Sequence, residues 1–361
     1  MTDYISGRRA TRRVTAGGAP IGGGAPVSIQ SMIEVKTADA ARAAGRINAL
    51  AAAGCEICRA AVADMDDAAA IARIKPLVSL PIVADIHFDY RLALAALESG
   101  ADKLRLNPGN IPRDGLREVA RAAAGRCVPI RVGVNGGSLG AALAAKSDAE
   151  RAKALAGAAL DSADLLESCG FSDIVLSMKA ASVPVSVMAH EIAAAACDYP
   201  FHVGITEAGT LGPGSVKSAA GIGAILSLGI GDTIRVSLTA DPAEEIACAK
   251  RILQSLGLRR FGAEVISCPT CGRTRVGLIE LARRVEGALA DVSAPITVAV
   301  MGCAVNGPGE ARDADVGVAC GDGCGLLFRK GEIVRKVPEQ YIFGELMKLV
   351  EETVCDTRDR D

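Results

Sequence analysis

Residues 82–106, IVADIHFDYRLALAALESGADKLRL, hold two short apolar runs on either side of an alanine-rich segment. The runs at 82–86 and 103–106 have the length and composition of buried strands, whereas the segment between them places apolar residues three and four positions apart, as a helix does. A strand, a helix and a second strand in this order are typical of two parallel strands joined by a crossover. We therefore predict that this stretch is one repeat of a parallel α/β fold.

The same alternation extends through most of the chain. Short strand-like runs followed by alanine-rich helical stretches occur at 27–32, 55–59, 82–86, 103–106, 130–134, 173–177, 201–205 and 233–237. Eight strands with intervening helices over about 240 residues predict a (β/α)8 TIM-like barrel, although a doubly wound sheet has the same local pattern. Glycine-rich turns at 17–18 and 22–24 predict a short hairpin before the first barrel strand.

The alternation stops around Leu258-Arg-Arg-Phe-Gly262. We therefore predict a barrel over residues 1–260 and a small α+β domain over residues 261–361. In the second domain we expect a helix at 277–289, a strand at 296–300, a hairpin within 315–335 and a closing helix at 341–354.

Composition excludes several classes of function. The chain of 361 residues has 40 basic and 42 acidic side chains, 3% aromatic residues and no tryptophan, so we expect no binding of nucleic acid. It shows neither an uncharged apolar run of about 18 residues nor the apolar core of a secretory signal, so we expect no membrane span and a cytoplasmic location. Twelve cysteines in such a chain favour free thiols and metal ligands over disulfides.

Two stretches of the second domain have the pattern of a soft-metal site, namely Cys268-Pro-Thr-Cys271-Gly-Arg273 and Met301-Gly-Cys303-Ala-Val-Asn-Gly-Pro-Gly-Glu310. A C-x2-C pair with a third cysteine one helix length later fits an iron–sulfur cluster or zinc. Structural zinc takes four ligands, whereas a cubane held by three thiolates leaves one iron for a weaker ligand. Glu310 follows a glycine-rich turn and is our candidate for that exchangeable ligand. Spacing alone leaves a cluster, zinc and metal-free core cysteines open.

The predicted strand ends of the barrel carry an unusual set of cations, Arg59, Arg105, Arg131, Arg235 and Lys179. Burying these charges is expensive without an anion, and several arginine forks that converge predict a diphosphate ligand. One or two of the arginines could instead form buried salt bridges. The polar residues that we expect to share this substrate site are Asp85, His87, Asn107, Asn135 and Ser237.

Glu207 follows the seventh predicted strand directly, in Ile205-Thr-Glu-Ala-Gly209. We expect it to be the general acid or base of the site, although a glutamate in this position often only caps a helix.

CPTCGR at 268–273 and MGCAVNGPGEA at 301–311 resemble the iron–sulfur domain of the 4-hydroxy-3-methylbut-2-enyl diphosphate synthase family. The stretches 28–32, 84–87, 104–110, 130–135, 177–179, 205–209 and 231–237 resemble the barrel motifs of the same family. The resemblance runs from residue 9 to about 350 and is to the shorter bacterial form, which has no domain inserted between barrel and cluster domain.

The resemblance implies a function in isoprenoid precursor biosynthesis by the non-mevalonate pathway. It implies a [4Fe-4S] cluster on Cys268, Cys271, Cys303 and Glu310, with water as an alternative to Glu310. The implied reaction is the two-electron reduction and dehydration of 2-C-methyl-D-erythritol 2,4-cyclodiphosphate to (E)-4-hydroxy-3-methylbut-2-enyl diphosphate. The implied electron donor is a ferredoxin or a flavodoxin. A homodimer is also implied, in which the cluster domain of one chain caps the barrel of the other.

Two other functions are compatible with parts of the pattern. A barrel lyase or aldolase with a structural zinc domain would use Lys179 to form a Schiff base. A non-catalytic iron–sulfur regulator would use only the second domain, and the cationic strand ends argue against it. Cys320 and Cys324 depart from the family pattern, so the number of cysteines does not define the number of ligands.

Overall fold

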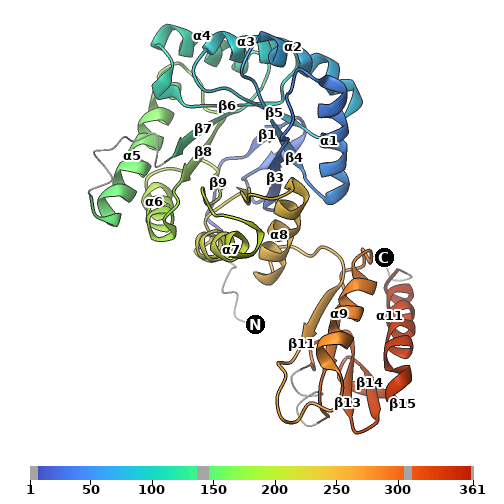
Figure 1. Ribbon diagram of the computed structural model, residues 1–361. Coiled ribbons are helices and arrows are strands. Elements are labelled where there is room, and N and C mark those ends of the chain that lie inside the picture. Colours follow the sequence, from blue (N-terminus) through green and yellow to red (C-terminus); the bar gives the residue numbers. More distant parts are fainter. Residues whose placement is uncertain (1–6, 136–145, 305–310, 359–361) are drawn as a thin grey trace. The chain divides into compact units, whose positions relative to one another are not determined.

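The computed structural model describes residues 7–135, 146–304 and 311–358. Its chain divides into two compact units, Met1–Arg259 and Arg260–Asp361 (Figure 1). Each unit has its own sheet and its own apolar core, so the two are described separately.

The first unit is built on eight strands in the order β8-β7-β6-β5-β4-β3-β10-β9, in which every neighbouring pair is parallel. A parallel bridge between Leu176 and Phe201 brings β8 beside the start of β9, so the sheet closes on itself. This closure confirms the predicted barrel and excludes the doubly wound alternative. The strands are β3 (Ser28–Met32), β4 (Ile57–Ala61), β5 (Ile82–Asp85), β6 (Lys103–Leu106), β7 (Ile130–Asn135), β8 (Ile174–Lys179), β9 (His202–Val203) and β10 (Thr233–Ile234).

In the described part of this unit, eight helices surround the ring of strands (Figure 1). Several begin at an aspartate whose side chain accepts a backbone N–H of the first turn, as Asp39, Asp64, Asp89 and Asp241 do. Alanines make up much of their buried faces, and such small side chains let a helix lie close to the sheet. The helices are α1 (Ala40–Ala53), α2 (Met65–Ile74), α3 (Tyr90–Glu98), α4 (Arg113–Ala124), α5 (Asp148–Glu167), α6 (Val183–Ala196), α7 (Leu211–Ser227) and α8 (Pro242–Ser255).

A hairpin of β1 (Val14–Ala16) and β2 (Ala19–Ile21) precedes the barrel, as the glycine-rich turns predict. Gly17 and Gly18 form its turn with positive φ angles, which glycine adopts at little cost. The apolar side chains of the hairpin pack against Ile57, Val83 and Val175, which lie in the amino-terminal halves of their strands. The hairpin therefore closes the amino-terminal end of the barrel, and the carboxyl ends of the strands form the other end.

The second unit contains a five-stranded sheet in the order β11-β12-β13-β14-β15, parallel from β11 to β13 and antiparallel beyond. Helices α9 and α11 pack against it around Val285, Val298, Val318 and Leu346. The predicted helices and strands are present, and β11 is an additional strand that we did not predict. The elements are β11 (Glu264–Ser267), α9 (Leu278–Leu289), β12 (Thr297–Met301), β13 (Val316–Gly321), β14 (Cys324–Arg329), β15 (Glu332–Pro338) and α11 (Ile342–Arg358).

Within the described residues, the structure contains no helix of sufficient length and apolarity to traverse a bilayer.

Candidate functional site

Register between the strands places the predicted cations on the inner face of the barrel. Asp85 pairs with Arg105, and Arg105 pairs in turn with Arg131 across β5, β6 and β7. Because side chains alternate along a strand, Asn135 lies on the same face as Arg131, and it pairs with Lys179 of β8. These residues from four consecutive strands therefore share the barrel interior toward the carboxyl ends of the strands.

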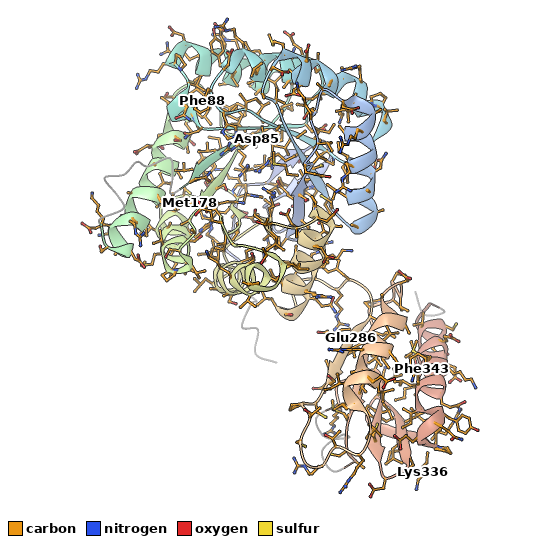
Figure 2. The ribbon with its side chains drawn as sticks, in the orientation of Figure 1. Asp85, Phe88, Met178, Glu286, Lys336 and Phe343 are labelled. Carbon is orange, nitrogen blue, oxygen red and sulfur yellow. The ribbon has the colours of Figure 1, made fainter. Side chains whose placement is uncertain are left out.

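Asp85 is the anionic centre of this group, and it lies within the ring of strands (Figure 2). One carboxylate oxygen lies 3.3 Å from Nε of Arg59, and the other lies 3.0 Å from Nη1 of Arg105. Burial acts to raise the pKa of Asp85, but the charges of Arg59, Arg105 and Arg131 outweigh it and the pKa is lowered. Asp85 is therefore ionised and orients two arginines whose remaining N–H groups can face a ligand.

Arg131 and Lys179 are more deeply buried than the arginines bound to Asp85, with exposed fractions of 2% and 5%. Burial lowers the pKa of both side chains well below the ordinary values, and repulsion by neighbouring arginines adds to this effect. The same surroundings would favour a bound anion, because an anion would offset both the burial and the repulsion.

Two glycines on the inner face make room for these cations. A Cβ atom at Gly133 would lie 2.7 Å from Nε of Arg105, and a Cβ atom at Gly204 would lie 2.6 Å from Nζ of Lys179. A side chain at either position would require the cation to shift, and at Gly204 it would also lie 2.5 Å from the backbone oxygen of Arg235.

Glu245 is a second buried carboxylate of the site, and sequence reasoning did not identify it. It lies in the first turn of α8 and accepts hydrogen bonds from the backbone N–H of Leu238 at 2.9 Å and from Oγ of Ser31 at 3.3 Å. Its other contact is Nη2 of Arg235 at 3.5 Å. In sequence, a glutamate just after a helix start indicates ordinary capping, so only its burial distinguishes it.

Lys103 and His202 are further interior residues. The sequence did not single out Lys103, and it left His202 open between a contact with the ligand and a core histidine. Lys103 is fully buried and His202 is 1% exposed, and neither Nζ of Lys103 nor either ring nitrogen of His202 has a hydrogen-bond partner among the described residues. Burial, and then the nearby cations, lower the pKa of both well below the ordinary values. His202 is therefore neutral near pH 7, and the ligand-free barrel disfavours the charged form of Lys103.

The other predicted residues lie around the strand ends. Nη1 of Arg105 is 3.1 Å from a ring nitrogen of His87, a half-exposed side chain whose pKa is lowered, mainly by burial. Asn107 caps a short 3-10 turn by accepting the N–H of Gly109 at 3.2 Å, and Ser237 is partly buried after β10.

Glu207 is exposed, and its φ angle of 53° lies in the left-handed region. A non-glycine residue rarely adopts this conformation, and such strain concentrates at functional sites. The backbone oxygen of Glu207 accepts a hydrogen bond from Nζ of Lys217 at 3.0 Å, which helps to hold the turn.

The second unit brings parts of the cysteine motifs together. Sγ of Cys268 accepts the backbone N–H of Gly302 at 3.2 Å, so the first motif lies against the residue that precedes Cys303. The pKa of the exposed Cys271 thiol is lowered, first by a hydrogen bond from the backbone of Arg273. Soft, ionisable sulfur donors with an N–H group directed at one of them suit an iron–sulfur cluster.

Within the described part of the chain, no three cysteine, histidine or acidic side chains lie close enough to hold a single metal ion. The donors themselves, soft sulfur atoms on two adjoining motifs, are of the kind that hold iron–sulfur clusters. Glu310, the predicted fourth ligand, lies outside the described residues.

Cys320 and Cys324 do not form a matched pair. Cys320 pairs in register with Gly325 and Cys324 pairs with Gly321, so the two thiols lie on opposite faces of the β13–β14 hairpin. Burial raises the pKa of Cys320 to about 12, and the charges of Glu339 and Cys268 add to this. Cys320 is therefore a protonated core residue in this structure.

A closed barrel that presents converging buried cations at the carboxyl ends of its strands defines an enzyme of the TIM-barrel class that acts on an anionic small molecule. Two family descriptions match the chain, the GcpE TIM-barrel domain over residues 11–250 and the GcpE protein C-terminal domain over residues 264–352. The chain belongs to the GcpE family.

Relatives at about half identity extend over nearly the whole chain. A protein of Geobacter sulfurreducens named 4-hydroxy-3-methylbut-2-en-1-yl diphosphate synthase (flavodoxin) is 53% identical over 347 residues, which are 96% of this chain and 98% of that relative. A Bacillus subtilis protein of the same name is 53% identical over 348 residues, which are 96% of this chain and 92% of that relative. The family resemblance predicted from the motifs is thereby confirmed.

Among solved structures, a dihydropteroate synthase from Stenotrophomonas maltophilia aligns with 68% of this chain and 98% of its own, with a TM-score of 0.52 and 15% identity. At this identity the likeness concerns the barrel fold alone.

Proposed function

We propose that this chain catalyses the reaction for which its relatives are named, as a (E)-4-hydroxy-3-methylbut-2-enyl diphosphate synthase of the non-mevalonate isoprenoid pathway. The substrate would be 2-C-methyl-D-erythritol 2,4-cyclodiphosphate. One ring C–O bond breaks, one hydroxyl leaves as water, and two electrons and the accompanying protons enter. The observation that carries the proposal is the group of buried cations around Asp85 in a chain of this family.

The barrel unit, whose bounds are close to the predicted range 1–260, would bind the diphosphate. Arg59, Arg105, Arg131 and Lys179 supply the positive charge, which stabilises the negative charge that grows as the ring opens. Asp85 orients two of these arginines, so it acts through them. The neutral contacts would come from His87, Asn107, Asn135 and Ser237.

Glu207 would donate the proton to the departing hydroxyl. The residue is exposed in the turn that follows β9, and its left-handed backbone conformation is the kind of strain that concentrates at functional sites.

The second unit, whose bounds are close to the predicted range 261–361, would hold a [4Fe-4S] cluster. Its ligands would be Cys268, Cys271 and Cys303, with Glu310 or water on the fourth iron. When bound, the cluster supplies electrons one at a time and a Lewis-acidic iron. The chain's own contribution is the N–H of Gly302 directed at Cys268, which stabilises the thiolate form of that ligand.

The proposed function also requires an electron donor and suggests a second copy of the chain as a partner. A flavodoxin, which the relatives' names mention, or a ferredoxin would deliver the electrons. A homodimer would let the cluster unit of one chain complete the barrel site of the other. We place the protein in the cytoplasm, with no membrane or nucleic acid as partner; all twelve cysteines are free thiols, which agrees with a reducing compartment.

The test is anaerobic purification followed by an optical spectrum, iron and acid-labile sulfide analysis, and turnover of the cyclic diphosphate with reduced methyl viologen. We expect a brown protein with about four irons per chain, and loss of both cluster and turnover in Cys303→Ala. Stoichiometric zinc without sulfide would refute the redox function and favour a lyase with a structural zinc unit. In that case Lys179 would be tested for a Schiff base by borohydride trapping.

A further inference from the structure

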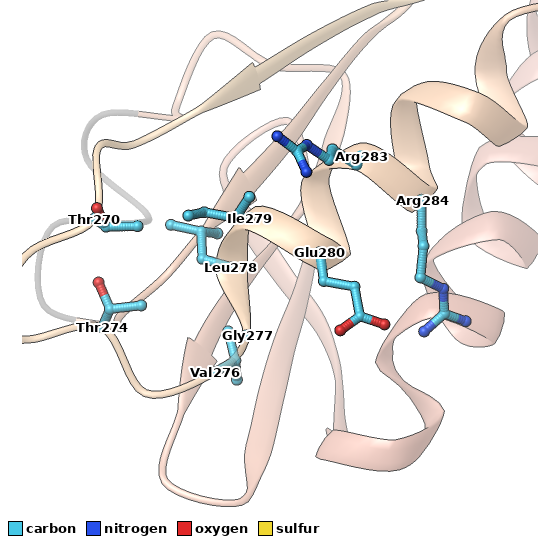
Figure 3. Close-up of a pocket in the computed structure, with 9 residues that line it drawn as sticks. All are labelled: Thr270, Thr274, Val276, Gly277, Leu278, Ile279, Glu280, Arg283 and Arg284. Carbon is cyan, nitrogen blue, oxygen red and sulfur yellow. The ribbon is translucent and has the colours of Figure 1, made fainter.

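A pocket of about 560 Å³ lies in the second unit, between the first cysteine motif and the start of α9. Figure 3 shows Thr270 and Thr274 on one side of it and Ile279, Glu280 and Arg283 of the helix on the other. None of these side chains has a role in the proposed chemistry.

The threonines that line this pocket also adjoin the first cysteine motif. Thr270 stands between Cys268 and Cys271 in the sequence, and Oγ1 of Thr274 accepts the N–H of Cys271 at 3.0 Å. Thr274 and Leu278 lie so close to Gly302 that a Cβ atom there would come within 3.1 Å and 3.0 Å of them. A molecule seated in the pocket would therefore be separated from the cysteine ligands by a single layer of residues.

The surface around the pocket combines an exposed apolar side chain with positive charge. Ile279 is 58% exposed, although it directly follows the buried Leu278 at the start of the helix. Arg283 is exposed and has no ion-pair partner among the described residues, and the guanidinium of Arg284 stacks on the ring of Phe343 at 4.4 Å. Glu280 is the one acidic residue among those that line the pocket.

We propose that this face, defined by Thr270, Thr274, Ile279, Arg283 and Arg284, is the docking surface for the electron donor, an acidic flavin-bearing carrier of the flavodoxin type. The inference rests on the proposed function, because it gives a surface to a donor that the reaction requires. An exposed apolar centre with a charged rim is the usual composition of a protein interface. Positive charge at the rim attracts an acidic partner and accelerates its approach.

The geometry meets the main requirement of such a partner. Electrons must pass from the flavin of the donor to the cysteine-bound cofactor, so the docking face must adjoin the cysteine motifs. The threonines of the pocket satisfy this condition because they belong to the first motif or contact it.

The test compares two electron donors on the anaerobic holoenzyme and on its Arg283→Glu and Ile279→Ser variants. Methyl viologen, a small chemical reductant, needs no docking surface, whereas photoreduced flavodoxin does. We expect Arg283→Glu to raise the KM for flavodoxin about tenfold or more and to slow flavodoxin oxidation in stopped-flow mixing, with viologen-driven turnover and iron content unchanged. Ile279→Ser should raise the same KM with less change in its salt dependence, because it removes apolar contact and no charge.

Lys336→Glu is the matched control, because it makes the same change of charge at an exposed position on the edge strand β15 of the same unit. We expect no change in KM with this variant. An unchanged flavodoxin KM in Arg283→Glu would overturn the docking proposal, as would an equal loss with both donors, which would place the face against the barrel of a second copy. If the unmodified chain showed no turnover with methyl viologen and none with flavodoxin, the proposed function itself would be overturned.

Discussion

Lys103→Met should stabilise the ligand-free barrel. The unmodified Lys103 is fully buried, its Nζ has no described partner, and burial lowers its pKa well below 10.5. Methionine fills a similar volume without an amine. A neutral amine left unsatisfied in the interior costs about 1–3 kcal/mol. A second contribution comes from the proton that the lysine must lose in order to fold.

The sign of the pH dependence follows from the lowered pKa. Above the folded pKa and below about 10.4, the unfolded chain binds a proton at Lys103 and the folded chain does not, so stability rises by about 1.4 kcal/mol per pH unit. The cost of losing the proton is therefore larger at pH 9 than at pH 10.4, because the unfolded lysine holds its proton more firmly at the lower pH. The substitution should therefore raise the free energy of unfolding by at most about 1.5 kcal/mol more at pH 9 than at pH 10.4, which is at most about 3–6 °C in Tm.

The assay is urea unfolding of the ligand-free protein followed by far-UV circular dichroism at pH 8, 9 and 10.4. Lys75→Met is the control, since Nζ of Lys75 contacts Asp102 at 2.6 Å and its loss should destabilise the barrel slightly. A Lys103→Met protein that is less stable at pH 9, or whose gain does not shrink as the pH rises, would show that the amine is charged and paired.

Three further substitutions test the site. Asp85→Asn leaves Arg59 and Arg105 without their carboxylate, so we expect a loss of about 3–5 kcal/mol in unfolding free energy and weaker substrate binding, measured by urea melts and by KM; an unchanged KM would contradict the orienting role. Gly133→Ala should lower kcat/KM while the iron content stays constant, because its Cβ would lie 2.7 Å from Nε of Arg105; full activity would show that the arginine moves freely. Glu207→Gln should lower kcat about 10²-fold or more with little effect on KM in steady-state assays, and a purely raised KM would assign it to binding instead.

Periodicity was sufficient to predict the strands and helices of the barrel because each repeat has a strong local signal, whereas closure of the sheet was seen only in the structure. The run at 82–85 is buried throughout and is followed by a helix with an aspartate cap, so neither element depends on distant contacts for its assignment. The strand β11, by contrast, has only partly buried residues and an exposed end, and its short run Glu-Val-Ile-Ser has no distinctive pattern. It is a strand because it pairs with β12, a contact that no local signal reveals.

Some residues of the site could likewise be identified from the sequence, and others could not. Arginines on apolar strands stand out in sequence because burial of a lone charge is expensive, so Arg59, Arg105 and Arg131 were identifiable. Glu245 was not, since a glutamate in a first helical turn has an ordinary structural explanation, and His202 fitted a ligand contact and a core histidine equally well. Their importance depends on which side chains the closed barrel brings opposite them, and that is determined by the whole ring of strands.

The hairpin of β1 and β2 leaves the barrel interior open at one end only. Because Val14, Ala16 and Ile21 close the far end, a ligand of the interior can enter and leave only past the carboxyl ends of the strands. Product that remains bound therefore prevents the next substrate molecule from binding. A molecule bound at the carboxyl ends of the strands is therefore expected to block both the entry of substrate and the release of product.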